Sequence, residues 1–154
     1  MKHAILLTVV LATLGGGCGS TQSDAPKEGT AISPAIVEPY LNIQTALAKD
    51  SVDGVKANAG QIATAAAALG APAVPIDTAA VQLASAADLA DARLKFGTLS
   101  DAMVTYMDGF HLTPPEGVRA ASCPMVKKPW LQRGSTIANP YYGSEMLGCG
   151  SFRQ

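Results

Sequence analysis

The chain has 154 residues, a net charge of −1 and a composition that is 48% hydrophobic. This length allows one compact domain and little more. The 11 basic and 12 acidic residues form no basic stripe of the kind that nucleic-acid binding requires, so we expect no nucleic-acid partner.

The first 18 residues have the pattern of an export signal. Lys2 gives a positive start, an apolar run covers residues 4–14, and small residues precede Cys18. We predict a bacterial lipoprotein, cut before Cys18, whose lipidated cysteine anchors it at a membrane surface on the periplasmic side of the envelope. A cleaved soluble periplasmic protein and an uncleaved anchor are the alternatives. Gly19 gives no signal for inner-membrane retention, so similarity to lipoproteins in general indicates the outer membrane, if the cell has one.

Residues 19–32 are small, polar and without periodicity, which predicts a flexible tether. A single domain is then expected over residues 33–154. Its first part has helical spacing of apolar residues. One helix is predicted over 34–48, after an N-cap at Ser33, and a second over 52–69, capped by Asp50 or Ser51. Gly54 and Gly60 inside the second helix each cost up to about 1 kcal/mol, and close helix packing is expected to compensate.

A third helical stretch is predicted over 77–110, with Asp77 as its cap. Its apolar stripe shifts near residue 88, so one long helix or two are possible, and we favour two. Short connections favour antiparallel neighbours. The predicted fold is therefore mostly α, a small up-and-down bundle of three to four helices with a short irregular or two-strand C-terminal motif.

The C-terminal part changes character after residues 113–117. We expect a strand over 118–122 and an isolated apolar anchor at 130–132. A short helical turn should begin near Asn139 and continue through Leu147. Residues 151–153 could pair with the strand at 118–122, which would bring Cys123 and Cys149 close together.

Four sulfur side chains define the candidate site. On an extended segment, Cys123 and Met125 point to the same face, and on a helical turn Met146 and Cys149 are neighbours. Thiol and thioether ligands suit Cu(I) or Ag(I) and suit Zn²⁺ less well, because structural zinc sites use cysteine and histidine without methionine. This pattern predicts a site for a soft monovalent ion.

A disulfide between Cys123 and Cys149 is the alternative. Assigning Cys18 to the lipid leaves an even pair of cysteines in an oxidising compartment, where disulfides persist. The bridge would close a loop of about 27 residues and contribute roughly 3.5 kcal/mol on the chain-entropy model. Met125 and Met146 would then be ordinary packing residues.

The sequence offers little support for an enzyme. His111 is the one histidine outside the export signal, and no nucleophile motif accompanies it. The chain also has no glycine-rich phosphate loop. We therefore expect a non-catalytic protein.

Several segments together resemble one bacterial family. They are residues 40–50, Cys123-Pro124-Met125, Trp130-Leu131-Gln132 and residues 137–150, within a similarity that covers about residues 34–151. The chain resembles the domain-of-unknown-function 3347 family, found alone in envelope lipoproteins and fused to periplasmic adaptor subunits of copper/silver efflux pumps. The short basic stretch 126–129 departs from that pattern.

The resemblance implies heavy-metal handling, with Cys123, Met125, Met146 and Cys149 as candidate ligands. It also implies an efflux system or another envelope protein as a partner. We therefore predict a Cu(I) or Ag(I) buffer, or an accessory to heavy-metal efflux. The alternative is an interaction module with an oxidised cysteine pair.

Overall fold

The computed structural model describes residues 30–153. The predicted signal peptide, the predicted lipidation site Cys18 and most of the predicted tether lie outside the described residues. Within that range no helix is both long and apolar enough to cross a membrane. In chain order, the elements are α1 (Pro34–Ala48), α2 (Val55–Ala68), η1 (Ala71–Ala73), α3 (Val74–Ala84), α4 (Leu89–Gly109), β1 (Val118–Cys123), β2 (Lys128–Arg133), η2 (Gly143–Glu145) and β3 (Ser151–Phe152).

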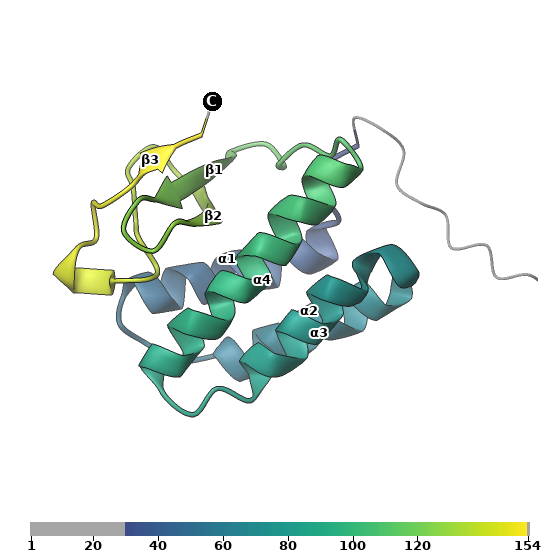
Figure 1. Ribbon diagram of the computed structural model, residues 1–154, viewed down its shortest axis with the longest axis horizontal. Helices are drawn as coiled ribbons and strands as arrows, with labels where there is room; N and C mark the ends of the chain where they lie inside the picture. Colours follow the sequence, from purple (N-terminus) through teal and green to yellow (C-terminus); the bar gives the residue numbers. More distant parts are fainter. Residues whose placement is uncertain (1–29, 154) are drawn as a thin grey trace, which may run out of the picture.

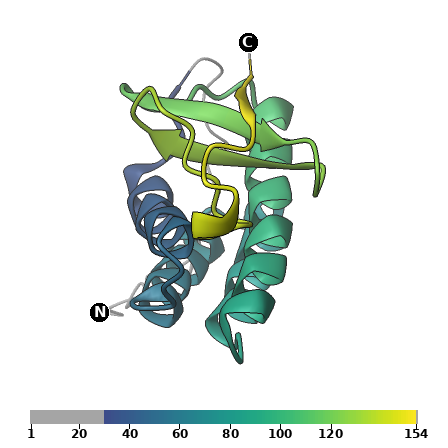
Figure 2. The same cartoon turned by 90° about the vertical axis from the view of Figure 1, so that its left-hand side faces the viewer.

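The mostly α class is confirmed, and four α-helices precede the sheet (Figure 1). Consecutive helices pack against each other, and the sheet lies across α1 and α4. Figure 2 shows the sheet above the helices, with the η2 turn between α1 and α4. The core includes Tyr40, Phe96 and Trp130, all fully buried. The Tyr40 hydroxyl joins the two layers, because it bonds Ser100 Oγ of α4 at 2.6 Å and accepts the Leu131 N–H of β2 at 3.2 Å.

The domain begins before Ser33. Ile32 is buried, and its N–H donates to the carbonyl of Thr113 at 3.2 Å. Helix α1 has the predicted bounds, Pro34–Ala48. Its start follows from Pro34, whose fixed φ suits the first turn and whose missing N–H would have no helical partner there.

The predicted start of the second helix was wrong. Helix α2 begins at Val55, because Gly54 has φ +73° and the left-handed conformation cannot continue a helix. Val52, expected on the buried stripe, is 47% exposed. The expected packing around Gly60 was also wrong, because a Cβ there would meet nothing within 4 Å.

The predicted 77–110 stretch forms two helices, as favoured. Asp77 is not a cap, since α3 already begins at Val74, directly after the η1 turn. The cap of α4 is Asp88, whose carboxylate accepts the N–H of Asp91 at 2.8 Å. A capping aspartate at this position explains the shift of the apolar stripe near residue 88.

The C-terminal motif is a three-stranded antiparallel sheet with the order β2-β1-β3. The expected pairing of the last residues with β1 is confirmed, with Phe152 opposite Ala121. The description as a short irregular or two-strand motif was incomplete, because residues 130–132 belong to β2 and Trp130 pairs with Ala121 of β1. The expected helical turn after Asn139 is reduced to η2.

Candidate dithiol site

The sheet brings the two C-terminal cysteines together. Cys123 is the last residue of β1 and is 1% exposed, and half-buried Cys149 lies just before β3. Antiparallel pairing places Ser151 opposite Ser122. The two thiols lie close enough for each to shift the pKa of the other, and no disulfide joins them. The sheet therefore brings two thiols close together.

The turn between β1 and β2 surrounds the sulfur of Cys123 with donors. The backbone N–H groups of Met125 and Val126 and the side-chain amide of Asn139 lie near it, and each favours its ionised form. Burial raises the pKa of Cys123. The hydrogen bonds from Val126, Asn139 and Met125, together with the contact to Cys149, outweigh that effect and lower the pKa below that of an ordinary thiol. Cys123 is therefore the member of the pair that ionises first.

The pKa of Cys149 is shifted in the opposite direction, above that of an ordinary thiol. Burial raises its pKa, and so do its hydrogen bond to Cys123 and the negative charge that forms there. A thiolate at Cys123 therefore makes loss of the proton from Cys149 less favourable. A cation between the two sulfurs would remove this repulsion.

Asn139 organises the segment that carries Cys149. Its fully buried side chain donates to the Cys149 carbonyl at 2.6 Å and accepts the Tyr141 N–H at 2.8 Å. Its backbone N–H donates to the carbonyl of Leu147 at 2.8 Å, and its own carbonyl accepts the Gly143 N–H at 3.1 Å. Both ends of residues 139–149 are thus tied to one residue. The sequence marked Asn139 only as the start of a helical turn.

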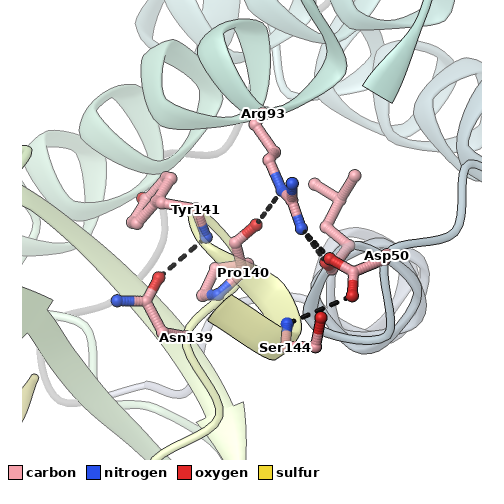
Figure 3. A network of polar contacts seen from close by, with 7 residues as sticks. Asp50, Arg93, Asn139, Pro140, Tyr141 and Ser144 are labelled. Carbon is pink, nitrogen blue, oxygen red and sulfur yellow. Dashed lines mark hydrogen bonds and ion pairs between the residues drawn. The ribbon is translucent and has the colours of Figure 1, made fainter. Parts of the chain in front are cut away.

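An ion pair between Arg93 and Asp50, two residues far from the cysteines in sequence, fixes the position of residues 139–149 (Figure 3). Arg93 of α4 donates to the carbonyls of Pro140 and Leu47, each at 3.1 Å, and to Asp50 at 2.5 Å. Asp50 in turn accepts the Ser144 N–H at 3.1 Å. Hydrogen bonds from Ser144 and Arg93 lower the pKa of Asp50. We call Asp50 and Arg93 the clamp.

Two glycines let the segment fit against its neighbours. Gly143 has φ +55°, and a Cβ there would lie 1.9 Å from Asp50 Oδ1 and 2.2 Å from Arg93. Gly150 has φ +143°, and its Cβ would lie 2.6 Å from Trp130. Both positions combine a backbone conformation that L residues rarely adopt with no space for a side chain.

Buried glutamines hold the beginning of the C-terminal loop, residues 134–150. Gln44 of α1 donates to the carbonyl of Ala138 at 2.7 Å. Gln132 of β2 accepts the indole N–H of Trp130 at 2.9 Å and donates to the carbonyl of Thr136 at 2.7 Å. Sequence reasoning missed these roles, although a glutamine within an apolar helix face or strand is a usable signal for a buried hydrogen bond.

The two methionines lie next to the thiols in the chain but are not packed. Met125 is 61% exposed and Met146 is 38% exposed. Their backbones touch the site, because the Met125 N–H bonds Cys123 and the Met146 carbonyl accepts the Cys149 N–H at 2.9 Å. The structure thus brings together two of the four predicted sulfurs and leaves both thioethers at the surface.

Residues 30–153 contain no group of three or more histidine, cysteine, aspartate or glutamate side chains arranged to hold a metal ion. A site at the thiol pair would therefore depend on two cysteines and on methionine. Comparison of the chain with models of protein families, with curated proteins and with solved structures finds no match. The resemblance to the domain-of-unknown-function 3347 family stays a prediction.

Proposed function

We propose that this protein is an envelope lipoprotein, anchored through Cys18, that binds a soft monovalent ion such as Cu(I) or Ag(I). Cys123 and Cys149 supply the thiolate ligands, and Met125 and Met146 complete the coordination. The protein acts as a metal buffer or as an accessory to heavy-metal efflux, without catalysing a reaction.

The observation that carries the proposal is the placement of Cys123 at the end of β1 and of Cys149 just before β3, the strand that pairs with β1, so that each thiol influences the other. Two thiolates around one monovalent soft ion leave a single net negative charge, which the N–H groups facing Cys123 offset. Structural zinc normally takes four cysteine or histidine ligands, and this site offers two. A soft monovalent ion therefore fits the donor set better.

The exposure of the methionines supports a role in exchange. A thioether is neutral and binds a soft ion more weakly than a thiolate, so it can join or leave the coordination without a change of charge. Met125 and Met146 lie between the two cysteines in sequence and are exposed, so that a donor or acceptor of the ion can reach them. The anchor and the efflux partner rest on the sequence pattern of residues 1–18 and on the family resemblance.

A competition titration tests the metal proposal. The full chain with Cys18→Ser keeps two thiols, and the reduced protein is titrated anaerobically with Cu(I) against a chromogenic Cu(I) chelator. We expect one tightly bound ion, loss of competition in Cys123→Ser/Cys149→Ser, and weaker competition in Met125→Leu/Met146→Leu. Met103→Leu, at a fully buried core methionine, is the matched control and should bind as the parent does. A parent protein that does not compete refutes the proposal, and so does a double serine variant that competes equally well.

A stabilising disulfide is the second candidate, favoured by the same placement of the two cysteines. It predicts that protein purified in air has no free thiol at Cys123 or Cys149, does not compete for Cu(I), and loses roughly 3.5 kcal/mol of unfolding free energy on reduction. Free thiols after purification in air would exclude it.

A further inference from the structure

Two short segments leave apolar side chains at the surface of the molecule. They are residues 125–127 of the β1–β2 turn and residues 145–147 of the C-terminal loop, and every residue in them is exposed. Their apolar side chains are those of Met125, Val126, Met146 and Leu147. We call the two segments together the rim, and each of them one half of it.

Both halves of the rim lie at the thiol pair. The N–H groups of Met125 and Val126 are near the sulfur of Cys123. In the other half, the Met146 carbonyl accepts the N–H of Cys149 at 2.9 Å. The exposed apolar surface is therefore next to the two cysteines that hold the ion in the proposed function.

The two halves of the rim have matching apolar residues and opposite charges. Each half has one methionine and one branched aliphatic residue. The first half adds Lys127 and the second adds Glu145, and neither of them is in an ion pair within the described part of the chain. In a two-fold interface, a residue that meets a second residue on the other copy is met by it in turn. Lys127 of each copy can thus face Glu145 of the other, so the rim is complementary to itself.

The rim is too small to hold two copies together unaided. A stable interface takes about 800 Å² and roughly 20–30 residues from each partner. Leu94 of α4, 72% exposed, extends the rim, because it lines a hollow of about 370 Å³ together with Val126. Even with this extension the surface falls far below that size. A second copy therefore needs a further bond to stay in place.

The thiol pair supplies that bond when it holds an ion. No third cysteine, histidine or carboxylate joins the two thiols in the part of the chain that the structure describes. Cys149 is half-buried, so an ion bound to its sulfur is open towards the surface. Met125 and Met146 are exposed and not packed on the thiols of their own chain. Such thioethers can reach an ion that another copy presents at its surface.

We propose that two copies of this chain face each other through the rim when a soft ion binds, and that a methionine of each copy completes the coordination of the ion on the thiol pair of the other. This inference rests on the proposed function and names the partner of the site as a second copy. The ion replaces the thiol protons, which pass to the solvent, and no electron is transferred. Without the ion the chain is a monomer.

The test uses the full chain with Cys18→Ser, reduced and in chloride-free buffer. Size-exclusion chromatography with light scattering gives its mass as Ag(I) is added, and elemental analysis of the eluted protein gives the bound Ag(I). We expect a monomer without the ion and a dimer when each chain holds one ion. Met125→Leu/Met146→Leu keeps the apolar surface and should bind Ag(I) as a monomer. Met103→Leu, in the core, should dimerise as the parent does.

Charge reversal tests the predicted facing of the two halves. Lys127→Glu or Glu145→Lys alone places like charges opposite each other at two points of the dimer. Each should weaken dimerisation roughly ten-fold, the size of two exposed charge pairs. Lys56→Glu, on α2, makes the same change of charge outside the rim and should have no effect.

Restored pairing checks that the single variants are folded. Lys127→Glu/Glu145→Lys has opposite charges facing again and should dimerise as the parent does. An equal mixture of the two single variants should form a heterodimer, identified by native mass spectrometry with one variant labelled with heavy nitrogen.

The outcomes separate this inference from the proposed function. A chain that binds Ag(I) and stays a monomer overturns the inference and leaves the proposed function intact. Absence of bound Ag(I) overturns both. A dimer that tolerates the single charge reversals, or that persists without the two methionines, would mean that the ion joins the chains by another route and overturns the inference. A dimer that forms equally well without Ag(I) does the same.

Discussion

Replacing Gly143 by alanine should disconnect the C-terminal loop from the clamp. The new Cβ would lie 1.9 Å from Asp50 Oδ1 and 2.2 Å from the Arg93 guanidinium, so the ion pair or the loop must move. The left-handed conformation, φ +55° at this residue, costs an L residue about 1–2 kcal/mol. Forcing a methyl group into an occupied site adds about 1–3 kcal/mol. We expect a total loss of about 2–5 kcal/mol.

Urea unfolding of the full chain with Cys18→Ser, kept reduced, measures this loss. Gly148→Ala is the matched control, because it lies in the same loop and its Cβ would meet nothing within 4 Å. In thermal unfolding, the melting temperature of the Gly143→Ala variant should fall by on the order of 10 °C, and that of the control should change little.

The Gly143→Ala variant should also alter the thiol pair, because the loop carries both Asn139 and Cys149. Alkylation by iodoacetamide should become faster at Cys149 in the variant and remain unchanged in Gly148→Ala. Equal stability of the two alanine variants would refute the clamp as the element that fixes the loop. Normal alkylation in a destabilised Gly143→Ala variant would show that the thiol geometry does not depend on the clamp.

Three further outcomes are expected. Tyr40→Phe leaves a buried N–H of β2 without its acceptor and should cost about 1–3 kcal/mol of unfolding free energy, whereas Tyr106→Phe removes a buried hydroxyl that has no hydrogen-bond partner among residues 30–153 and should cost nothing; equal losses in urea unfolding would contradict this. Asn139→Ala removes a side-chain amide that lowers the pKa of Cys123, so the pKa from pH-dependent alkylation should rise, provided that circular dichroism shows an intact fold; an unchanged or lower value would contradict this effect of Asn139. Because hydrogen bonds from the C-terminal loop and α4 lower the pKa of Asp50, its contribution to stability is present above about pH 4 and is lost as the pH falls through the lowered value. Acid unfolding should therefore be less steep in Asp50→Asn, and an identical pH profile would argue against this contribution.

The spacing of apolar residues predicted helix bounds well where every residue of the periodic stretch belongs to the helix. Residues 34–48 have a proline at the start and a regular apolar face, and α1 has those bounds. The start of α2 could not be read in the same way. The apolar spacing extends back to Val52, but the chain uses positive φ at Gly54 and keeps Val52 at the surface. Periodicity cannot indicate which glycine adopts a left-handed conformation.

Strand β2 was missed because its residues do not alternate between buried and exposed. Trp130, Leu131 and Gln132 are buried one after another. Neighbouring strand residues point to opposite faces, so both faces must be covered here. Leu131 lies where the Tyr40 hydroxyl meets the sheet, and Trp130 lies beside Gly150 of the C-terminal loop. From the sequence alone, three consecutive apolar or buried residues do not indicate a strand, because the helices on one face and the C-terminal loop on the other are not yet known.

In the candidate site too, the local features could be predicted from the sequence and the contacts between distant residues could not. The spacing of Cys123 and Cys149 with the strand pattern on either side was enough to predict that the thiols meet. The residues that determine how they meet act from far away in the chain, since Arg93 and Asp50 are 43 positions apart and Gln44 lies 94 positions from its partner in the loop. Their effect reaches the sulfurs through the C-terminal loop, so the thiol pair depends on the packing of α1 against α4 as well as on its own motif. It follows that substitutions in the helices can change the geometry of the thiol pair without touching either cysteine.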